Sequence, residues 1–192
     1  TCPMPVLLVR TARKYAKPKL VAALDPQHAH DKPASLDKTL LATAASLASA
    51  LDGELHAAHA YKPYPYFAPG YPGDYVSLTQ VAPEIEREHR DSLASALAKL
   101  SATAGIPKAR QHLALGDPTE ALPTLAKKLG ASIVVMGAVS RSGLRRLFIG
   151  HTAQKVLERM PCDVLVVKPK SFKSPISKTS RPFGPITGFT VY

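Results

Sequence analysis

Short apolar segments alternate along the chain with longer segments in which apolar residues recur at helical spacing. The short segments are rich in Val, Ile, Leu and Ala and predict five strands, at residues 20–24, 54–61, 110–115, 133–136 and 164–167. The longer segments predict helices at about 36–51, 85–100, 117–130 and 152–160. This regular alternation predicts an α/β fold, with an open parallel sheet covered by helices on both faces.

Several residues mark the ends of these helices. Gly53 follows the first helical segment and Gly130 follows the third, which is where a glycine commonly ends a helix. Asp117 precedes Pro118 at the start of the third segment. We therefore expect Asp117 to be the N-cap of that helix and Pro118 to be its first residue.

The net charge of +11 comes mainly from the two ends of the chain. Residues 10–19 contain five basic residues and no acidic residue, and so do residues 168–192. The segment between them has fifteen basic and fourteen acidic residues. Solvated basic ends explain the excess better than a specific nucleic-acid surface, so we predict no specific nucleic-acid partner. The segment 170–192, rich in Ser, Pro and Lys, is predicted to be a disordered basic tail.

The sequence predicts neither a membrane span nor a secretory signal. The longest apolar runs, such as residues 132–139, are far shorter than the roughly 20 residues that a helix needs to cross a bilayer. No segment combines a charged start, an apolar middle and a cleavage site. The two cysteines, Cys2 and Cys162, are too few for a disulfide framework and suit buried thiols in a reducing compartment. We therefore expect a cytoplasmic protein.

An apolar segment near the start of the chain resembles the last predicted strand. Residues 6–9 read VLLV and residues 164–167 read VLVV, and a Cys and a Pro precede each run. We interpret residues 1–10 as the last strand of a preceding repeat and residues 11–18 as a linker. Because an unpaired apolar strand promotes aggregation, residues 4–10 are expected to form an antiparallel ribbon with residues 162–168 of the same chain or a neighbour.

Small and polar residues lead from the fourth predicted strand to the fourth helix. Small residues after a strand let backbone N–H groups approach an anion, and a helix N-terminus adds donors and a favourable dipole. This segment therefore predicts a phosphate-binding loop at the carboxyl edge of the sheet, where open α/β folds bind ligands. The alternative is a plain strand–helix turn with solvated arginines. The candidate loop residues are Met136, Gly137, Ser140, Arg141, Ser142, Gly143, Gly150, His151 and Thr152.

Five segments resemble the universal stress protein family in their order and intervals. They read LVAALD at 20–25, GDP at 116–118, IVVMG at 133–137, GHT at 150–152 and CDVLVVKP at 162–169. The resemblance covers about residues 19–169 and is similar to the second half of tandem two-domain members. It implies an adenine nucleotide α-hydrolase-like fold with five parallel strands in the order 3-2-1-4-5. It also implies pairing with a second universal stress protein domain through the fifth strand.

The resemblance further implies a binding site for ATP or another adenine nucleotide. The family motif is Gly, two residues, Gly, nine residues, Gly, and then Ser or Thr. Gly137 and Gly150 match this motif, whereas Ser140 replaces the second Gly. His151 takes the Ser/Thr position, with Thr152 next to it.

Two further nucleotide contacts of the family carry over to Asp25 and Ala60. Asp25 ends the first predicted strand and is suited to accept a hydrogen bond from a ribose hydroxyl, or else it caps the turn at Pro26. Ala60, in the second strand, would offer backbone groups to the edge of an adenine, or else it is a packed strand residue. The sequence leaves both alternatives open.

The sequence supports a metal site or a catalytic site less well than the nucleotide site. His28, His30 and Asp31 are possible ligands of a divalent metal, but a polar loop explains them better, and we predict no metal site. No serine lies in a nucleophile elbow beside a histidine, so we predict no catalytic residue and no enzymatic activity. Four other histidines are interpreted as partly buried structural residues: His56, His59, His89 and His112.

Together these observations predict a stress-response protein that binds an adenine nucleotide or related phosphate ligand and acts through conformation or partners. A second hypothesis is an interaction or scaffold protein that binds no nucleotide. A third is a slow ATPase or a carrier of a larger amphipathic ligand. The aromatic and Pro-rich loop at residues 62–74 would contact such a ligand, or it docks on its own domain.

Overall fold

The computed structural model describes residues 4–10, 14–27, 34–63, 83–137 and 151–169. They form one six-stranded sheet in the order β1-β6-β5-β2-β3-β4. The strands are β1 (Val6–Leu8), β2 (Lys19–Ala23), β3 (Glu54–Tyr61), β4 (Gln111–Leu115), β5 (Ile133–Gly137) and β6 (Asp163–Val167). The helices are α1 (Ala34–Ala50), α2 (Pro83–Ala102), α3 (Pro118–Leu129), α4 (His151–Arg159) and the short 3-10 helix η2 (Lys108–Arg110).

The parallel part of the sheet confirms the predicted fold. Strands β2 to β6 are mutually parallel, and their order β4-β3-β2-β5-β6 is the expected 3-2-1-4-5. The expected number of five strands is wrong, because β1 adds a sixth strand antiparallel to β6. Leu7 lies opposite Leu165 in this pair, which confirms the predicted antiparallel ribbon within one chain. Pairing with β1 satisfies backbone groups that the edge of β6 would otherwise expose.

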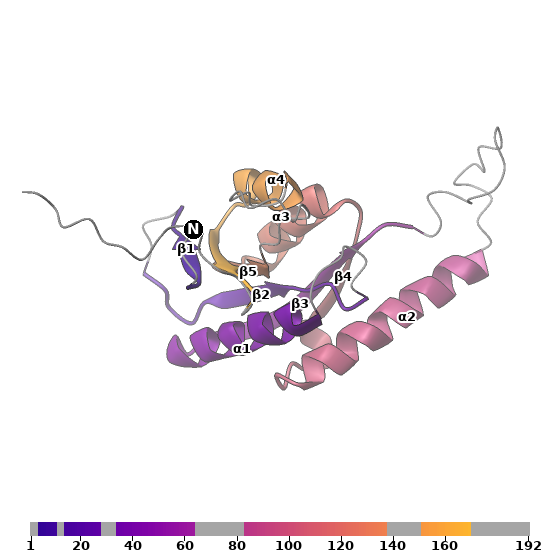
Figure 1. Cartoon of the computed structure of the whole chain (residues 1–192), viewed down its shortest axis with the longest axis horizontal. Coiled ribbons are helices and arrows are strands. Elements are labelled where there is room, and N and C mark those ends of the chain that lie inside the picture. Colours follow the sequence, from indigo (N-terminus) through magenta and orange to yellow (C-terminus); the bar gives the residue numbers. More distant parts are fainter. Residues whose placement is uncertain (1–3, 11–13, 28–33, 64–82, 138–150, 170–192) are drawn as a thin grey trace, which may run out of the picture.

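Helices cover both faces of the sheet, as predicted. In Figure 1, α1 and α2 lie on one side of the sheet and α3 and α4 on the other. The core on the first side includes Leu40 of α1 and Leu97 of α2, and the core on the second side includes Leu122 of α3 and Val156 of α4. The central strands contribute residues to both cores, which explains why their sequences are apolar throughout rather than alternating.

The caps of α3 are those that the sequence predicts. The Asp117 carboxylate accepts a hydrogen bond from the Thr119 N–H at 3.0 Å, and Pro118 begins the helix. This backbone hydrogen bond, together with bonds from the Thr119 hydroxyl and Lys62, lowers the pKa of Asp117 to about 2. Gly130 ends the helix in the left-handed conformation, with φ of 64°. A residue with a side chain would be strained in that conformation.

Buried polar contacts fasten the first segment of the chain to β6 and α4. Asp163 is fully buried and accepts hydrogen bonds from the Arg10 N–H, at 2.6 Å, and from the Tyr15 hydroxyl. Burial, and then the bond to the Asp163 carboxylate and its charge, raise the pKa of Tyr15 to about 12. The Arg10 guanidinium donates to carbonyl groups at the C-terminal end of α4, where a positive charge is favourable. These acceptors are Leu157, Glu158 and Met160.

Several expectations concern residues outside the described ranges. These are the tail at 170–192, the loop from residue 64 to residue 74, the linker residues 11–13, and Cys2.

The other cysteine, Cys162, is a buried free thiol, and burial raises its pKa to about 11. Among the residues that the structure describes, no helix is both long and apolar enough to cross a membrane.

Candidate functional site at the carboxyl edge of the sheet

The strand order places a topological switch point at β2. The chain passes from β2 to β3 and β4 on one side, and later returns to place β5 on the other side of β2. The connections that follow β2 and β5 therefore leave the carboxyl edge of the sheet in opposite directions. Open α/β sheets bind ligands at such points, outside the carboxyl ends of the strands. The strand order alone therefore predicts a ligand site at the carboxyl ends of β2, β3 and β5.

The strand register leaves β2 shorter than its neighbours at this edge. β2 pairs as far as Ala23, which lies opposite Ala58 of β3 and Met136 of β5. β3 then continues to Tyr61 alongside β4, and β5 continues to Gly137 alongside β6. The backbones of Ala60 and Gly137 therefore extend past the end of β2, one on each side of it.

Asp25 follows β2 and has an unusual environment. Both of its carboxylate oxygens are buried, and neither has a hydrogen-bond partner within the described part of the chain. Buried carboxylates are normally bonded, because removing a charge from water without compensation is costly. The predicted cap of the turn at Pro26 is therefore not formed with any described residue. The carboxylate is instead available as an acceptor for a group that is not part of the described chain.

The end of β2 is held by β3 through main-chain and side-chain bonds. The Leu24 N–H donates to the Ala58 carbonyl at 2.8 Å, and His59 Nδ1 lies 2.9 Å from the Leu24 carbonyl oxygen. A carbonyl can only accept, so His59 carries a hydrogen on Nδ1 in this contact. The sequence suggested only a structural role for this buried histidine. The structure adds that its side chain fixes the residue immediately before Asp25.

The remaining predicted site residues fall into two groups. Met136 is buried at the end of β5, next to Gly137. His151 and Thr152 begin α4, as the helix prediction requires, but the structure does not describe their side chains. The other predicted loop residues lie outside the described ranges: Ser140, Arg141, Ser142, Gly143 and Gly150. The structure therefore brings Asp25, Ala60 and Gly137 to one edge of the sheet and leaves the phosphate loop as a prediction.

Polar contacts border this edge on the side of β4. Lys62 Nζ lies 3.0 Å from Asp117 Oδ2, and this pair links the end of β3 to the N-terminus of α3. The Gly116 N–H donates to the Tyr61 carbonyl at 2.8 Å. Gly116 has φ of 128°, a conformation that favours glycine. The GDP segment of the family resemblance thus supplies the turn, the N-cap and the first residue of α3.

The described residues contain no group of three or more His, Cys, Asp and Glu side chains that could hold a metal ion. The candidate ligands His28, His30 and Asp31 lie outside the described ranges, so their interpretation stays a prediction.

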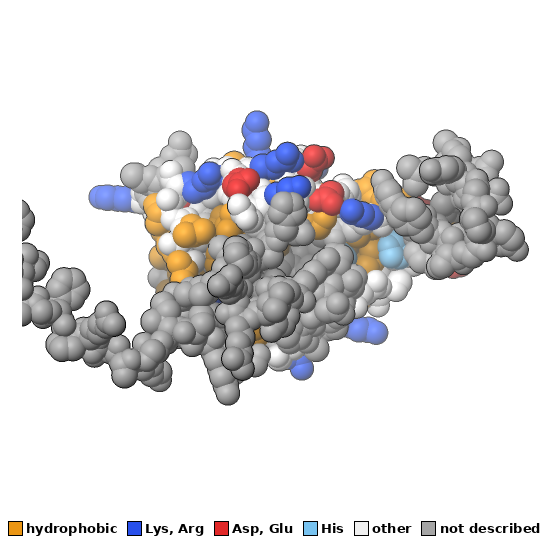
Figure 2. Space-filling model, turned by 45° about the horizontal axis from the view of Figure 1, so that its top comes forward, with side chains coloured by type: hydrophobic (Ala, Val, Ile, Leu, Met, Phe, Trp, Pro, Cys, Tyr) orange, Lys and Arg blue, Asp and Glu red, His pale blue; other side chains and the backbone are white. Residues whose placement is uncertain are grey.

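Surface charge on the face shown in Figure 2 is mixed. Lys and Arg side chains are interspersed there with Asp and Glu side chains. An ion pair joins the two helices α3 and α4, since Arg159 of α4 lies 3.2 Å from Glu120 of α3. The described side chains of this face therefore form no continuous basic patch of the kind that binds nucleic acids.

Comparisons with known proteins agree with this architecture. The sequence profile of the universal stress protein family matches residues 28–168. Universal stress protein E of Escherichia coli strain K12 is 29% identical over 177 residues, which cover 91% of this chain and 54% of that protein. The solved structure of a protein of unknown function from Pseudomonas aeruginosa PAO1 is 30% identical, with a TM-score of 0.66, and the match covers 88% of this chain and 53% of that one.

A universal stress protein solved in complex with cAMP has the same fold. It is 21% identical, with a TM-score of 0.52, and the match covers 80% of this chain and 98% of that one. The chain spans about half the length of the Escherichia coli and Pseudomonas relatives that it matches. The profile match, the strand order and the adenine nucleotide α-hydrolase-like fold lead to one conclusion: this chain belongs to the universal stress protein family.

Proposed function

We propose that this chain binds an adenine nucleotide or a related phosphate-bearing ligand at the carboxyl edge of its sheet. In this proposal it acts in a stress response in the cytoplasm, through changes in conformation or in partner contacts. The observation that carries the proposal is the Asp25 carboxylate, which is buried at the switch point and unbonded within the described chain. A ribose hydroxyl is a suitable donor for it, because a hydrogen bond to a carboxylate offsets the cost of its burial.

Each part of a nucleotide has a candidate partner at this edge. The backbone of Ala60 extends past the end of β2 and is placed to meet the edge of a base. The segment from Gly137 to the start of α4 would receive the phosphates, with backbone N–H groups and the N-terminus of the helix as donors. The relative solved with cAMP supports a ligand that combines adenine, ribose and phosphate.

Calorimetric titration with ATP tests the proposal. Asp25→Asn should weaken binding by about tenfold or more, since a hydrogen bond to a charged group contributes about 1.5–3 kcal/mol. Gly150→Val should abolish binding, because its side chain would occupy the space in which a phosphate approaches the backbone. The matched control is 2′,3′-dideoxy-ATP, which lacks the hydroxyl groups and should bind both wild type and Asp25→Asn with similar affinity.

Each alternative outcome has a clear meaning. If all three proteins bind ATP equally, the ligand site lies elsewhere. If none binds ATP, the chain is better described as an interaction protein without a nucleotide. Mass spectrometry of small molecules that co-purify with the chain would identify a larger amphipathic ligand. Release of phosphate from ATP would indicate slow hydrolysis, for which we propose no catalytic residue.

We also propose that a second universal stress protein domain packs against β1, which we interpret as the last strand of a preceding repeat. Exposed apolar side chains of this segment support the proposal: Met4, Leu7, Leu8 and Val9. The chain alone should then self-associate, and Leu8→Lys should reduce this. Sedimentation of both proteins over a range of concentrations measures the effect. A wild-type chain that stays monomeric throughout would contradict the proposal.

A further inference from the structure

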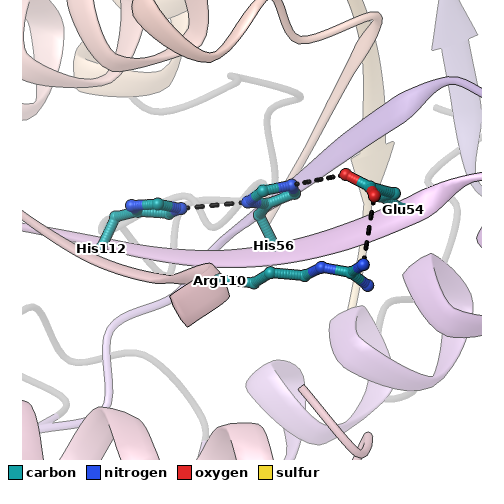
Figure 3. Close-up of polar contacts among 4 residues, drawn as sticks. All are labelled: Glu54, His56, Arg110 and His112. Carbon is teal, nitrogen blue, oxygen red and sulfur yellow. Dashed lines mark hydrogen bonds and ion pairs between the residues drawn. The ribbon is translucent and has the colours of Figure 1, made fainter. Parts of the chain in front are cut away.

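Two histidines form a direct hydrogen bond at the amino edge of the sheet, opposite the candidate ligand site. His56 Nδ1 of β3 lies 3.0 Å from His112 Nε2 of β4, and the ring centroids are 5.3 Å apart. Figure 3 shows the two rings side by side above the strands. The two residues are neighbours because His112 lies opposite Ala58, two positions after His56 and on the same face of the sheet.

Charged groups from four elements of the described chain act on this pair. Glu54 Oε2 lies 3.5 Å from His56 Nε2, a distance that makes an ion-pair contact but no hydrogen bond. Arg110 of η2 binds the other oxygen of Glu54 at 3.1 Å, as Figure 3 shows. Lys19 of β2 acts electrostatically on His56, and Lys128 of α3 acts on His112. Positive groups thus outnumber the single carboxylate.

The hydrogen bond between the rings depends on their protonation. In the neutral pair one facing nitrogen carries a hydrogen and the other accepts it. One added proton leaves this bond intact. A second proton places hydrogens on both facing nitrogens, so the bond is lost and two positive charges lie side by side. Glu54 cannot compensate for both charges, because Arg110 already shares it.

The protein environment opposes protonation of both rings. Burial lowers the pKa of His56, although Glu54 acts in the opposite direction. Burial also lowers the pKa of His112, and the nearby His56 and Lys128 lower it further. Because both pKa values are lower in the closed structure, opening of the pair takes up protons. The closed form is therefore fully favoured above about pH 6.5, the ordinary pKa of histidine, and loses stability as the pH falls below it.

We propose that the His56–His112 pair is an acid-sensitive latch, which holds β4 on the sheet near neutral pH and releases it on mild acidification. β4 is suited to this role because it is the outer strand of the described sheet and pairs only with β3. Its residues are only partly buried, so fewer apolar contacts oppose its release than would oppose release of a central strand. Release would expose the edge of β3, which could then pair with another chain.

Hydrogen exchange at about pH 7.5 and about pH 5.5, corrected for intrinsic rates, tests the latch. Each proton taken up on opening increases the open population by up to about tenfold per pH unit. Protection of residues 111–115 in β4 should therefore fall by about tenfold on acidification, while protection of residues 133–136 in β5 changes little. His112→Gln keeps a hydrogen-bonding side chain that does not titrate, so the loss of β4 protection on acidification should be clearly smaller than in the wild type.

His89→Gln is the matched control, because it removes a histidine whose ring contacts Tyr61 at a tilted angle and does not join the pair. This variant should respond like the wild type. Equal loss of β4 protection in wild type and His112→Gln, or no loss in wild type, would overturn the proposal. If His112→Gln does not fold, NMR titration of the imidazoles in the wild type decides. The latch requires His56 and His112 to titrate together below pH 6.5, and independent titration at ordinary values would exclude it.

Discussion

At the amino edge of the sheet, the buried Asp163 carboxylate has hydrogen-bond partners within the chain, whereas at the carboxyl edge the Asp25 carboxylate has none among the described residues. Asp163, at the amino end of β6, is fully buried and accepts bonds from Arg10 and Tyr15. At the same edge, Glu54 is bonded to Arg110 and contacts His56. Each edge therefore contains a carboxylate with buried oxygens, and the described residues provide hydrogen-bond donors for Asp163 but not for Asp25.

This difference in hydrogen bonding distinguishes a carboxylate that stabilises the fold, Asp163, from a carboxylate that is suited to bind a ligand, Asp25. A buried carboxylate with internal partners contributes to stability, and its removal leaves those partners unsatisfied. A buried carboxylate without a partner destabilises the free protein and becomes favourable only when a donor arrives. Substitutions that compare the two edges therefore make this distinction measurable.

The largest effect is expected for Asp163→Ala. It should lower the free energy of unfolding by about 3 kcal/mol, because it removes a charged acceptor and leaves two donors without a partner. The pKa of Tyr15 should also fall from about 12 toward its ordinary value. Urea denaturation and an absorbance titration measure the two effects. Tyr15→Phe, which removes one donor, should cost only about 1 kcal/mol.

Gly53→Ala tests how closely the amino edge is packed. A Cβ at this position would lie 2.4 Å from the carbonyl oxygen of Pro18, which accepts a bond from the Glu54 N–H. The backbone would have to move, at an expected cost of about 2 kcal/mol. Gly105→Ala is the control: its Cβ would meet nothing within 4 Å, so only the strain of its φ of 64° remains, about 1 kcal/mol. A smaller cost at Gly53 than at Gly105 would contradict this packing.

Asp117→Ala should cost about 1 kcal/mol, because it removes the N-cap of α3. Asp117→Asn retains an acceptor and should be nearly neutral. The pKa of Asp117 is lowered to about 2, so its contribution is present above its ordinary pKa of 3.8 and is lost as the pH falls toward 2. Thermal melting of the three proteins between neutral and acidic pH measures this. An equal loss in both variants would show that the charge of Asp117, and not its role as an N-cap acceptor, provides this stability.

The smallest effect on stability is expected for Asp25→Asn. Without ligand, this variant should be unchanged or more stable by about 0.5 kcal/mol, because it removes a buried charge that has no partner in the described part of the chain. The increase in melting temperature that ATP causes should nevertheless decrease. Denaturation with and without ATP measures both quantities. A loss of stability as large as that of Asp163→Ala would mean that Asp25 is bonded inside the protein, and the distinction between the two edges would fail.

Much of the fold could be predicted from local patterns. The five parallel strands, their helices and the caps at Asp117 and Gly130 follow from apolar spacing and from the conformational preferences of single residues. The antiparallel ribbon follows from the likeness of residues 6–9 to residues 164–167. The predicted sheet of five strands nevertheless left out β1, which pairs with β6. The strand order came from the family resemblance, because periodicity does not specify which strands are neighbours.

The candidate site could be predicted only in part. The family resemblance predicted Asp25 and Ala60 as site residues, and the spacing of small residues also predicted Gly137. No local sequence pattern indicates whether the Asp25 side chain caps a turn or binds a ligand. That question depends on which donors lie around it in three dimensions. His59 was expected to be structural, yet its bond to the Leu24 carbonyl depends on the contact between β3 and the end of β2.

Local sequence patterns specify the order and type of the elements, since helix and strand formation depends on apolar spacing over a few residues. Which polar groups come into contact depends instead on how distant strands and helices pack together. His56 and His112 are 56 positions apart, and Arg10 and Asp163 are 153 positions apart, so each contact requires a specific strand register. The same register leaves β2 short and the Asp25 carboxylate without a partner in the described chain. Long-range pairing carries no periodic signal along the chain, because it arises only when separate strands are brought side by side.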